Sequence, residues 1–139
     1  MASVFSLIIA GKIPGNFVWQ DDIAVAILTI QPIRDGHVLV IPREEIDQWS
    51  DLPLATMAHL SQVSHKIANA LKVLFPAQRV GMMIAGLEVP HTHIHLVPMD
   101  SMEDLSFAFA KNAEATHLQQ LAERIRNELQ QQGHLESRV

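Results

Sequence analysis

Three histidines alternate with other residues in the second half of the chain. His91, His93 and His95 are separated by Thr92 and Ile94. Because successive side chains of an extended strand point to opposite faces, we expect the three imidazoles on one face of a strand. The residues between them then point to the opposite face, where the apolar ones can pack against helices.

Such a row of imidazoles could carry out phosphoryl chemistry. Imidazole serves as nucleophile, general acid or hydrogen-bond donor near neutral pH. A neutral His93 could attack phosphorus while its neighbours donate hydrogen bonds to phosphate oxygens or protonate the leaving group. Close packing should also lower the mean pKa of the three rings, since charging one disfavours charging the next. Imidazole is also a common metal ligand, so a metal site on the same three histidines is an alternative.

Composition limits the other classes of function. The 139 residues fit one domain, residues 1–139, and a 48% hydrophobic content favours a folded chain. The formal charge of -5 argues against a nucleic-acid partner. The chain has no cysteine, which excludes disulfides, thiolate metal sites and thiol nucleophiles. No apolar run approaches the roughly 20 residues of a membrane span, so we expect no membrane partner and a cytoplasmic location.

The elements that position the histidines follow from hydrophobic periodicity and turn residues. We expect strands at 17–19, 23–30, 37–41, 78–85 and 91–97, a short helical turn at 7–13, and helices at 54–74 and about 114–132. Short turns between the first three strands favour antiparallel pairing. The predicted fold is α+β, with a five-stranded, mostly antiparallel sheet and two helices, and with a core spanning 5–100.

The segment from His91 to Pro98 resembles the signature of the histidine triad (HIT) family, in which three histidines alternate with apolar residues. Three upstream stretches also resemble the family, in the expected order: 8–14, 20–30 and 36–42. The resemblance covers about residues 5–98. The nucleotidyltransferase branch has glutamine at the position of His95, so this chain is more similar to the HINT-like hydrolase branch.

The resemblance implies an enzyme that releases a nucleoside 5'-monophosphate, AMP in the first place, from an amine or phosphate leaving group. His93 would be the nucleophile that forms a covalent nucleotidyl intermediate. His91 would orient the His93 ring, mainly through its backbone carbonyl. His95 would donate to phosphate oxygens, and His37 would complete the group. The resemblance implies no catalytic metal and no cofactor. It also implies a homodimer in which the two sheets join into one sheet of ten strands.

Two departures from the family pattern lie in the predicted substrate contacts. Thr29 stands where the family has an aspartate for the ribose hydroxyls, and Leu87 replaces a glutamine near the scissile phosphate. Glu88 adds a charge beside the phosphate. The predicted substrate-binding residues are Leu28, Thr29, Ile30, Leu87, Glu88 and Val89. These departures leave a nucleotide-binding module without turnover as an alternative function.

Two further expectations follow from the resemblance. Tryptophans such as Trp19 and Trp49 are more often core or interface anchors than ligand platforms. In this family, apolar residues in the region of Phe17 and Trp19 line the purine pocket, so either ring could still flank a base. Some members hold a structural zinc ion with N-terminal cysteines. Ser3 and Ser6 occupy that region here, so the chain resembles the zinc-free form.

Overall fold

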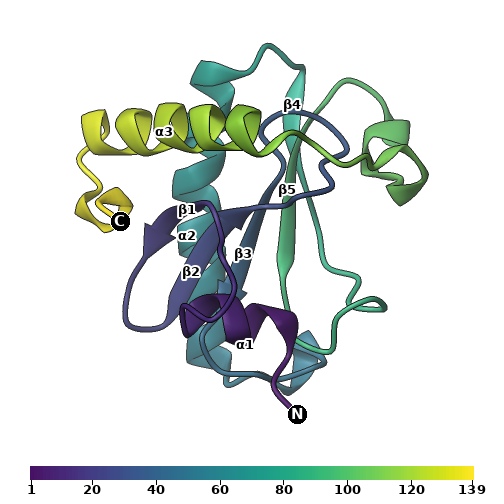
Figure 1. Cartoon of the computed structure of the whole chain (residues 1–139), viewed down its shortest axis with the longest axis vertical. Coiled ribbons are helices and arrows are strands. Elements are labelled where there is room, and N and C mark those ends of the chain that lie inside the picture. The colour runs from purple at the N-terminus through teal and green to yellow at the C-terminus, as the bar shows by residue number, and fades with distance from the viewer.

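A single five-stranded sheet forms the centre of the molecule (Figure 1). The computed structural model describes residues 1–139. The strands are β1 (Phe17–Gln20), β2 (Ala24–Leu28), β3 (Val38–Pro42), β4 (Arg79–Met83) and β5 (Ile94–Met99). Their order is β1-β2-β3-β5-β4, and every neighbouring pair is antiparallel. The predicted α+β fold with its five-stranded antiparallel sheet is therefore confirmed.

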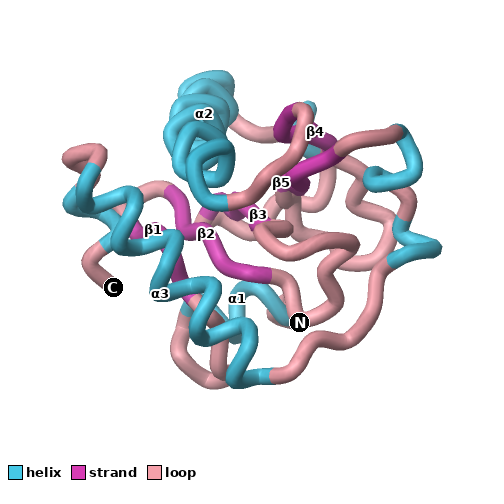
Figure 2. Tube along the Cα trace, turned by 90° about the horizontal axis from the view of Figure 1, so that it is seen from above, coloured by secondary structure: helices cyan, strands magenta, loops and turns pink.

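Three α-helices accompany the sheet: α1 (Val4–Ile9), α2 (Leu54–Leu74) and α3 (Ala115–Gln131). The bounds predicted for the two long helices agree with those of α2 and α3 within one residue at each end. Helix α2 connects β3 to β4, which lie on either side of β5. Figure 2 shows α2 and α1 on opposite sides of the sheet.

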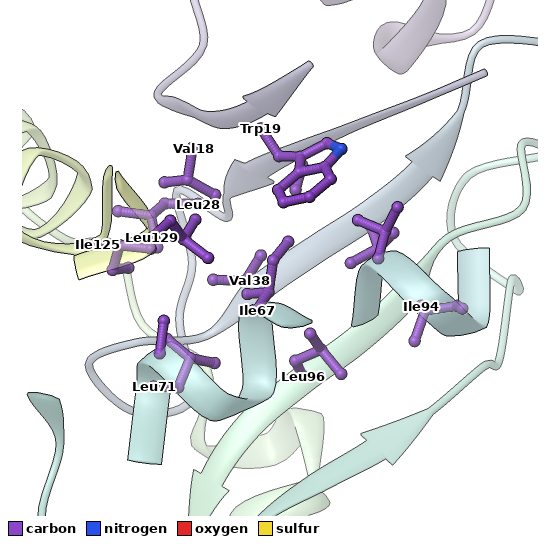
Figure 3. Close-up of a cluster of buried hydrophobic side chains, with 14 of the residues drawn as sticks. Val18, Trp19, Leu28, Val38, Ile67, Leu71, Ile94, Leu96, Ile125 and Leu129 are labelled. Carbon is purple, nitrogen blue, oxygen red and sulfur yellow. The ribbon is translucent and has the colours of Figure 1, made fainter. Parts of the chain in front are cut away.

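The two faces of the sheet bury different sets of side chains. Val38 and Val40 of β3 join the larger cluster, which contains α2 and α3 residues, whereas Leu39 packs in the smaller cluster with Phe5 of α1. On β5, Ile94 and Leu96 belong to the larger cluster, as Figure 3 shows. The apolar neighbours of the histidines thus pack against the helices as expected, and the histidine side chains are left to the α1 face.

The N-terminal helix differs from the sequence prediction. The turn expected at 7–13 is a helix that begins at Val4 and ends at Ile9, which makes a third helix beside the two expected. Ser3 explains the earlier start, because its side chain accepts a hydrogen bond from the Ser6 amide and caps the helix. Gly11, with φ of 78°, follows its end.

The histidine strand also starts later than predicted, at Ile94 instead of His91. The register pairs Val40 with Ile94, so its continuation would place Pro42 opposite Thr92. Proline has no N–H to donate, and the ladder with β3 ends there. The Thr92 amide donates instead to the carbonyl of Ile46, at 2.7 Å. His91 and His93 therefore precede the strand, held by contacts other than the β3 ladder.

None of the helices combines the length and apolar character needed to cross a bilayer.

Candidate active site

A tight turn delivers His37 to the start of β3. The His37 amide donates to the carbonyl of Arg34 at 3.2 Å, which closes the turn. Gly36 within it has φ of +89°, and a Cβ there would lie 2.8 Å from the Phe75 ring and 3.0 Å from Pro98. Only glycine fits this conformation in this space. The turn therefore packs closely against Phe75 and Pro98, and this packing fixes the position of His37.

His37 and His95 form a buried pair with a defined proton position. Nε2 of His37 lies 2.9 Å from Nδ1 of His95; His37 directly precedes β3, and His95 lies on the neighbouring β5. The Ile33 amide donates to Nδ1 of His37 at 3.1 Å, so Nδ1 has no proton. In the neutral ring Nε2 then carries the proton and donates to His95. His95 consequently has its own proton on Nε2, available to a bound oxygen.

His93 has the opposite tautomer. Its Nδ1 lies 2.8 Å from the carbonyl oxygen of His91. A carbonyl can only accept, so Nδ1 carries the proton and Nε2 of the neutral ring presents a lone pair. The resemblance implies this carbonyl contact, and the structure contains it. The side chain of His93 lines both of the cavities described below.

His91 lies outside these cavities and is fully buried. Nε2 lies 2.7 Å from the carbonyl of Pro42, and Nδ1 lies 2.7 Å from the hydroxyl of Ser3. Both ring nitrogens are therefore engaged within the protein. The three imidazoles do not present free nitrogens to one point.

Burial keeps the catalytic candidates neutral. Desolvation, with a smaller effect of the charge of His93, lowers the pKa of His37 from 6.5 to about 4. Desolvation, with smaller effects of His93 and His37, lowers the pKa of His95 to about 3. The pKa of His93 is also lowered mainly by desolvation, against a hydrogen bond to His91 and the charge of Glu88 that raise it. A neutral imidazole is the form that can act as a nucleophile.

Two phenylalanines that the sequence analysis did not single out enclose the histidine rings. The Phe5 ring meets His93 edge-on, with centroids 4.8 Å apart. Phe107 lies 4.9 Å from His95 in a tilted arrangement. These rings exclude water from one side of each imidazole, which adds to the desolvation. Phe5 lies far from the signature in sequence, Phe107 follows Pro98 by nine residues, and no local pattern marks either of them.

Two cavities meet at His93 and His95. The large cavity has a volume of about 620 Å³, and the small pocket about 70 Å³. Glu88, His93 and His95 line both. The remaining walls of the small pocket are Ala85, Gly86, Leu87 and Phe107. Those of the large cavity are Val4, Phe5, Ile8, 13–16, 27–30, Leu39, Val89, Ala113, Ala115, Leu118 and Gln119.

The six predicted substrate-binding residues all line one or both cavities. Leu28, Thr29, Ile30 and Val89 face the large cavity, Leu87 faces the small pocket, and Glu88 faces both. The Thr29 hydroxyl accepts a hydrogen bond from the Gln31 amide at 3.2 Å. It keeps one proton to donate, but this wall has no carboxylate for the ribose hydroxyls.

Trp19 is the core residue that its type favours, and the alternative that the ring of Phe17 or Trp19 flanks a base is not supported. Neither residue lines the large cavity. Trp19 is buried in the core, where its indole N–H donates to Asp21 at 2.8 Å. The burial of β1 against α3 and the C-terminal turn explains this placement. Phe5 and Ile8 of α1 supply the apolar wall instead.

The residues around His91 do not fit a zinc ion. Ser3, Ser6 and Glu45 surround its Nδ1, and no cluster of three or more His, Cys, Asp or Glu side chains could hold a metal. A neutral hydroxyl is a poor zinc ligand, and Nδ1 already accepts a hydrogen bond from Ser3. A metal ion held by the three alternating histidines would likewise lack His91 as a ligand, because both ring nitrogens of His91 already form hydrogen bonds.

Comparison with known proteins identifies the family. The profile of the HIT domain matches residues 10–102. The chain belongs to the HIT family. An uncharacterised HIT-like protein of Borreliella burgdorferi is 33% identical over 111 residues, which cover 75% of this chain and 80% of that protein. A zinc-bound histidine triad protein of Mycobacterium smegmatis superposes with a TM-score of 0.81 at 28% identity, covering 96% of each chain.

Another HIT relative has a named activity. The adenosine 5'-monophosphoramidase of Saccharomyces cerevisiae is 31% identical over 98 residues, which cover 70% of this chain and 62% of that enzyme. Hydrolysis of nucleotides is thus an activity found among relatives of this HIT protein. The matched range contains all four histidines of the site, whereas α1 and α3 lie outside it.

Proposed function

We propose that this HIT protein is a nucleotide hydrolase that releases a nucleoside 5'-monophosphate, AMP in the first place, through a covalent intermediate on His93. One observation carries the proposal: the Nδ1–H of His93 is held by the His91 carbonyl, which directs the Nε2 lone pair of a neutral ring toward the cavities. The phosphoramidase relative supports the reaction class.

The geometry suits a substrate whose α-phosphate lies at the junction of the two cavities. The large cavity, about 620 Å³ and mostly apolar, has room for a nucleoside. The small pocket receives the start of the leaving group. His95 lines both and directs its Nε2 proton at a phosphate oxygen, which stabilises developing negative charge without a cation.

The reaction proceeds by two displacements. Nε2 of His93 attacks the α-phosphorus, a P–N bond to the ring forms, and the bond to the leaving nitrogen or oxygen breaks. The leaving atom takes a proton from solvent. Water then attacks the same phosphorus, the P–N bond breaks with its electron pair returning to Nε2 of His93, and one proton of the water passes to solvent. The His91 carbonyl stabilises the ring while it bears positive charge during the intermediate.

Charge at the small pocket favours an amine over a polyphosphate as leaving group. Glu88 lines the pocket, and no Lys or Arg lines either cavity. A polyphosphate brings negative charge that needs donors or cations to offset it. An amine is neutral or positive and is attracted by the carboxylate. We therefore place phosphoramidates first among the substrates.

The test is AMP release measured by chromatography with EDTA present. Adenosine 5'-phosphoramidate and a dinucleoside polyphosphate are offered to the wild type, to His93→Ala and to the matched control His117→Ala, whose exposed ring contacts only Asp35. We expect release by the wild type and the control, and none by His93→Ala. Equal release by all three would exclude His93 as the nucleophile, and tight binding without release would favour the binding module.

We also propose that two copies pair through β4 to join their sheets. β4 is an edge strand, and Met82 on it is 57% exposed. The other edge, β1, is contacted by α3 and the C-terminal turn 135–137. An uncovered edge can accept a further strand. Light scattering of the wild type should give twice the chain mass, and Met82→Glu should lower it; a monomeric wild type would contradict the pairing.

A further inference from the structure

Ser3, in the first turn of the chain, contacts the histidine that precedes the nucleophile by two residues. Its Oγ lies 2.7 Å from Nδ1 of His91, although the two residues are 88 positions apart. Ser3 is only 7% exposed and His91 is 0% exposed. A hydrogen bond this buried is protected from competition by water.

The direction of this hydrogen bond is fixed by the other side of the ring. Nε2 of His91 lies 2.7 Å from the Pro42 carbonyl, which can only accept. Nε2 therefore carries the proton, and Nδ1 of the neutral ring is an acceptor. The Ser3 hydroxyl must then donate to it. Two partners on opposite sides thus fix both the tautomer and the orientation of His91.

Glu45 and Ser6 hold the Ser3 hydroxyl in that direction. Oε1 of Glu45 accepts from the Ser3 amide at 2.6 Å and from the Ser6 hydroxyl at 2.7 Å. The bond from Ser6, followed by that from Ser3, lowers the pKa of Glu45 to about 2, so the carboxylate stays an acceptor. The Ser6 hydroxyl is thereby engaged with Glu45, while the Ser6 amide occupies an acceptor site on Ser3. The Ser3 hydroxyl has two acceptors within reach, Nδ1 of His91 at 2.7 Å and the Ser6 hydroxyl oxygen at 3.4 Å, and the much shorter contact assigns its proton to His91.

His91 passes this constraint to His93. Its carbonyl oxygen accepts from Nδ1 of His93 at 2.8 Å, and its ring lies outside both cavities. Any rotation or shift of His91 moves the acceptor that holds the nucleophilic ring. No hydrogen bond joins Ser3, Ser6 or Glu45 to His93. None of these three residues lines the small pocket.

We propose that Ser3, supported by Ser6 and Glu45, is a positioning residue that sets the orientation and tautomer of His93 through His91. The inference rests on the proposed function and deepens it, because it assigns a role to Ser3 and Ser6, which lie before the range matched by the family profile, and to Glu45 within that range. It also gives the first turn of the chain a task in the reaction beyond folding.

The test must separate the lost donor from the lost helix cap, since Ser3 also caps α1. Glycine caps a helix almost as well as serine but offers no hydroxyl. Ser3→Gly and Ser3→Ala therefore both remove the donor, while Ser3→Thr keeps it. Ser61→Ala is the matched control, because the Ser61 hydroxyl lies on the exposed face of α2 and donates to the carbonyl of Met57 in the same helix.

Two readouts are measured on each full-length variant. For AMP release from adenosine 5'-phosphoramidate, we expect kcat to fall about tenfold in Ser3→Gly and Ser3→Ala, with KM nearly unchanged and Ser3→Thr largely restored. In nitrogen-15 NMR of the histidine rings without substrate, the wild type should show single tautomers for His91 and His93. Both donor-free variants should show exchange averaging at the two rings.

The NMR readout does not depend on turnover, so it tests the positioning even if the wild type releases no AMP. Unchanged ring signals in Ser3→Gly and Ser3→Ala would overturn the inference. A fall in kcat in Ser3→Ala but not in Ser3→Gly would also overturn it, because only the cap would then matter.

Discussion

Backbone groups assign the proton positions of the four histidines, directly for His37, His91 and His93 and through His37 for His95. The Ile33 amide determines the tautomer of His37, which in turn determines that of His95. The carbonyls of His91 and Pro42 do the same for His93 and His91. Because backbone groups cannot exchange donor for acceptor, the site needs no rearrangement before the nucleophile is ready.

Activity should depend on pH through His93. Desolvation lowers its pKa below 6.5, so the neutral, nucleophilic form persists to lower pH than for an exposed histidine. We expect kcat/KM to stay level from alkaline pH downward and to fall only below pH 6.5. A pH profile of AMP release measures this. An acid limb at or above 6.5 would contradict a desolvated nucleophile.

Glu88 should control both the leaving group and that acid limb. Its charge raises the pKa of His93 against the larger effect of burial. In Glu88→Gln we expect the limb to move to lower pH, and kcat/KM for a dinucleoside polyphosphate to rise several-fold relative to adenosine 5'-phosphoramidate. Glu123→Gln, an exposed substitution on α3, is the control. An unchanged substrate ratio would remove Glu88 from leaving-group selection.

At the scale of elements, the turn before β3 is the most demanding connection of the site. Gly36→Ala places a Cβ in a left-handed conformation and against Phe75. Gly133 has a similar φ of +90° with nothing within 4 Å, so Gly133→Ala introduces the backbone strain alone. We expect Gly36→Ala to lower the free energy of unfolding by about 1–3 kcal/mol more than Gly133→Ala, measured by denaturant unfolding. Equal losses would mean that the neighbours of Gly36 give way freely.

Element types and the ends of the two long helices were largely predictable from sequence, whereas the starts of β5 and α1 were not. Periodicity located the two long helices, and short apolar runs between turn residues located the five strands. The start of β5 depended on the missing N–H of Pro42 on another strand, and that of α1 on the Ser3 cap. Such ends are set by the residues that contact them. A contacting residue that is distant in sequence, such as Pro42, leaves no trace in the local hydrophobic repeat.

At the scale of the whole molecule, the buried histidines make stability depend on pH. Burial lowers the pKa of His37 to about 4 and that of His95 to about 3, against 6.5 for the unfolded chain. Above pH 6.5 both states are neutral at these rings. As pH falls from 6.5 toward 4, the unfolded chain binds protons that the folded chain excludes, so the free energy of unfolding decreases.

We expect that loss to reach a few kcal/mol in denaturant unfolding at successive pH values. His37→Gln removes one of the responsible groups and should flatten the dependence, whereas exposed His117→Gln should follow the wild type. The same slope in all three proteins would mean that other groups govern the acid sensitivity.

Assembly of the site was only partly predictable. Alternation along 91–95 placed three imidazoles on one side, and the resemblance added His37 and the six contact residues. The rings of Phe5 and Phe107, the hydroxyl of Ser3 and the wall at 113–119 came only from the structure. They come from segments far from the signature, brought to it by packing across the sheet.

The residues that line the large cavity come from separate segments of the chain. Its reacting histidines come from the middle of the chain, but α1 and the segment 113–119 supply walls from the two ends, beyond the matched residues 10–102. Part of the wall of this cavity thus lies outside the matched range, and the rest, at 13–16, 27–30, Leu39, Glu88 and Val89, lies within it. Grafting the terminal segments of another HIT protein onto this middle portion would exchange that outer part of the wall and leave the four histidines unchanged.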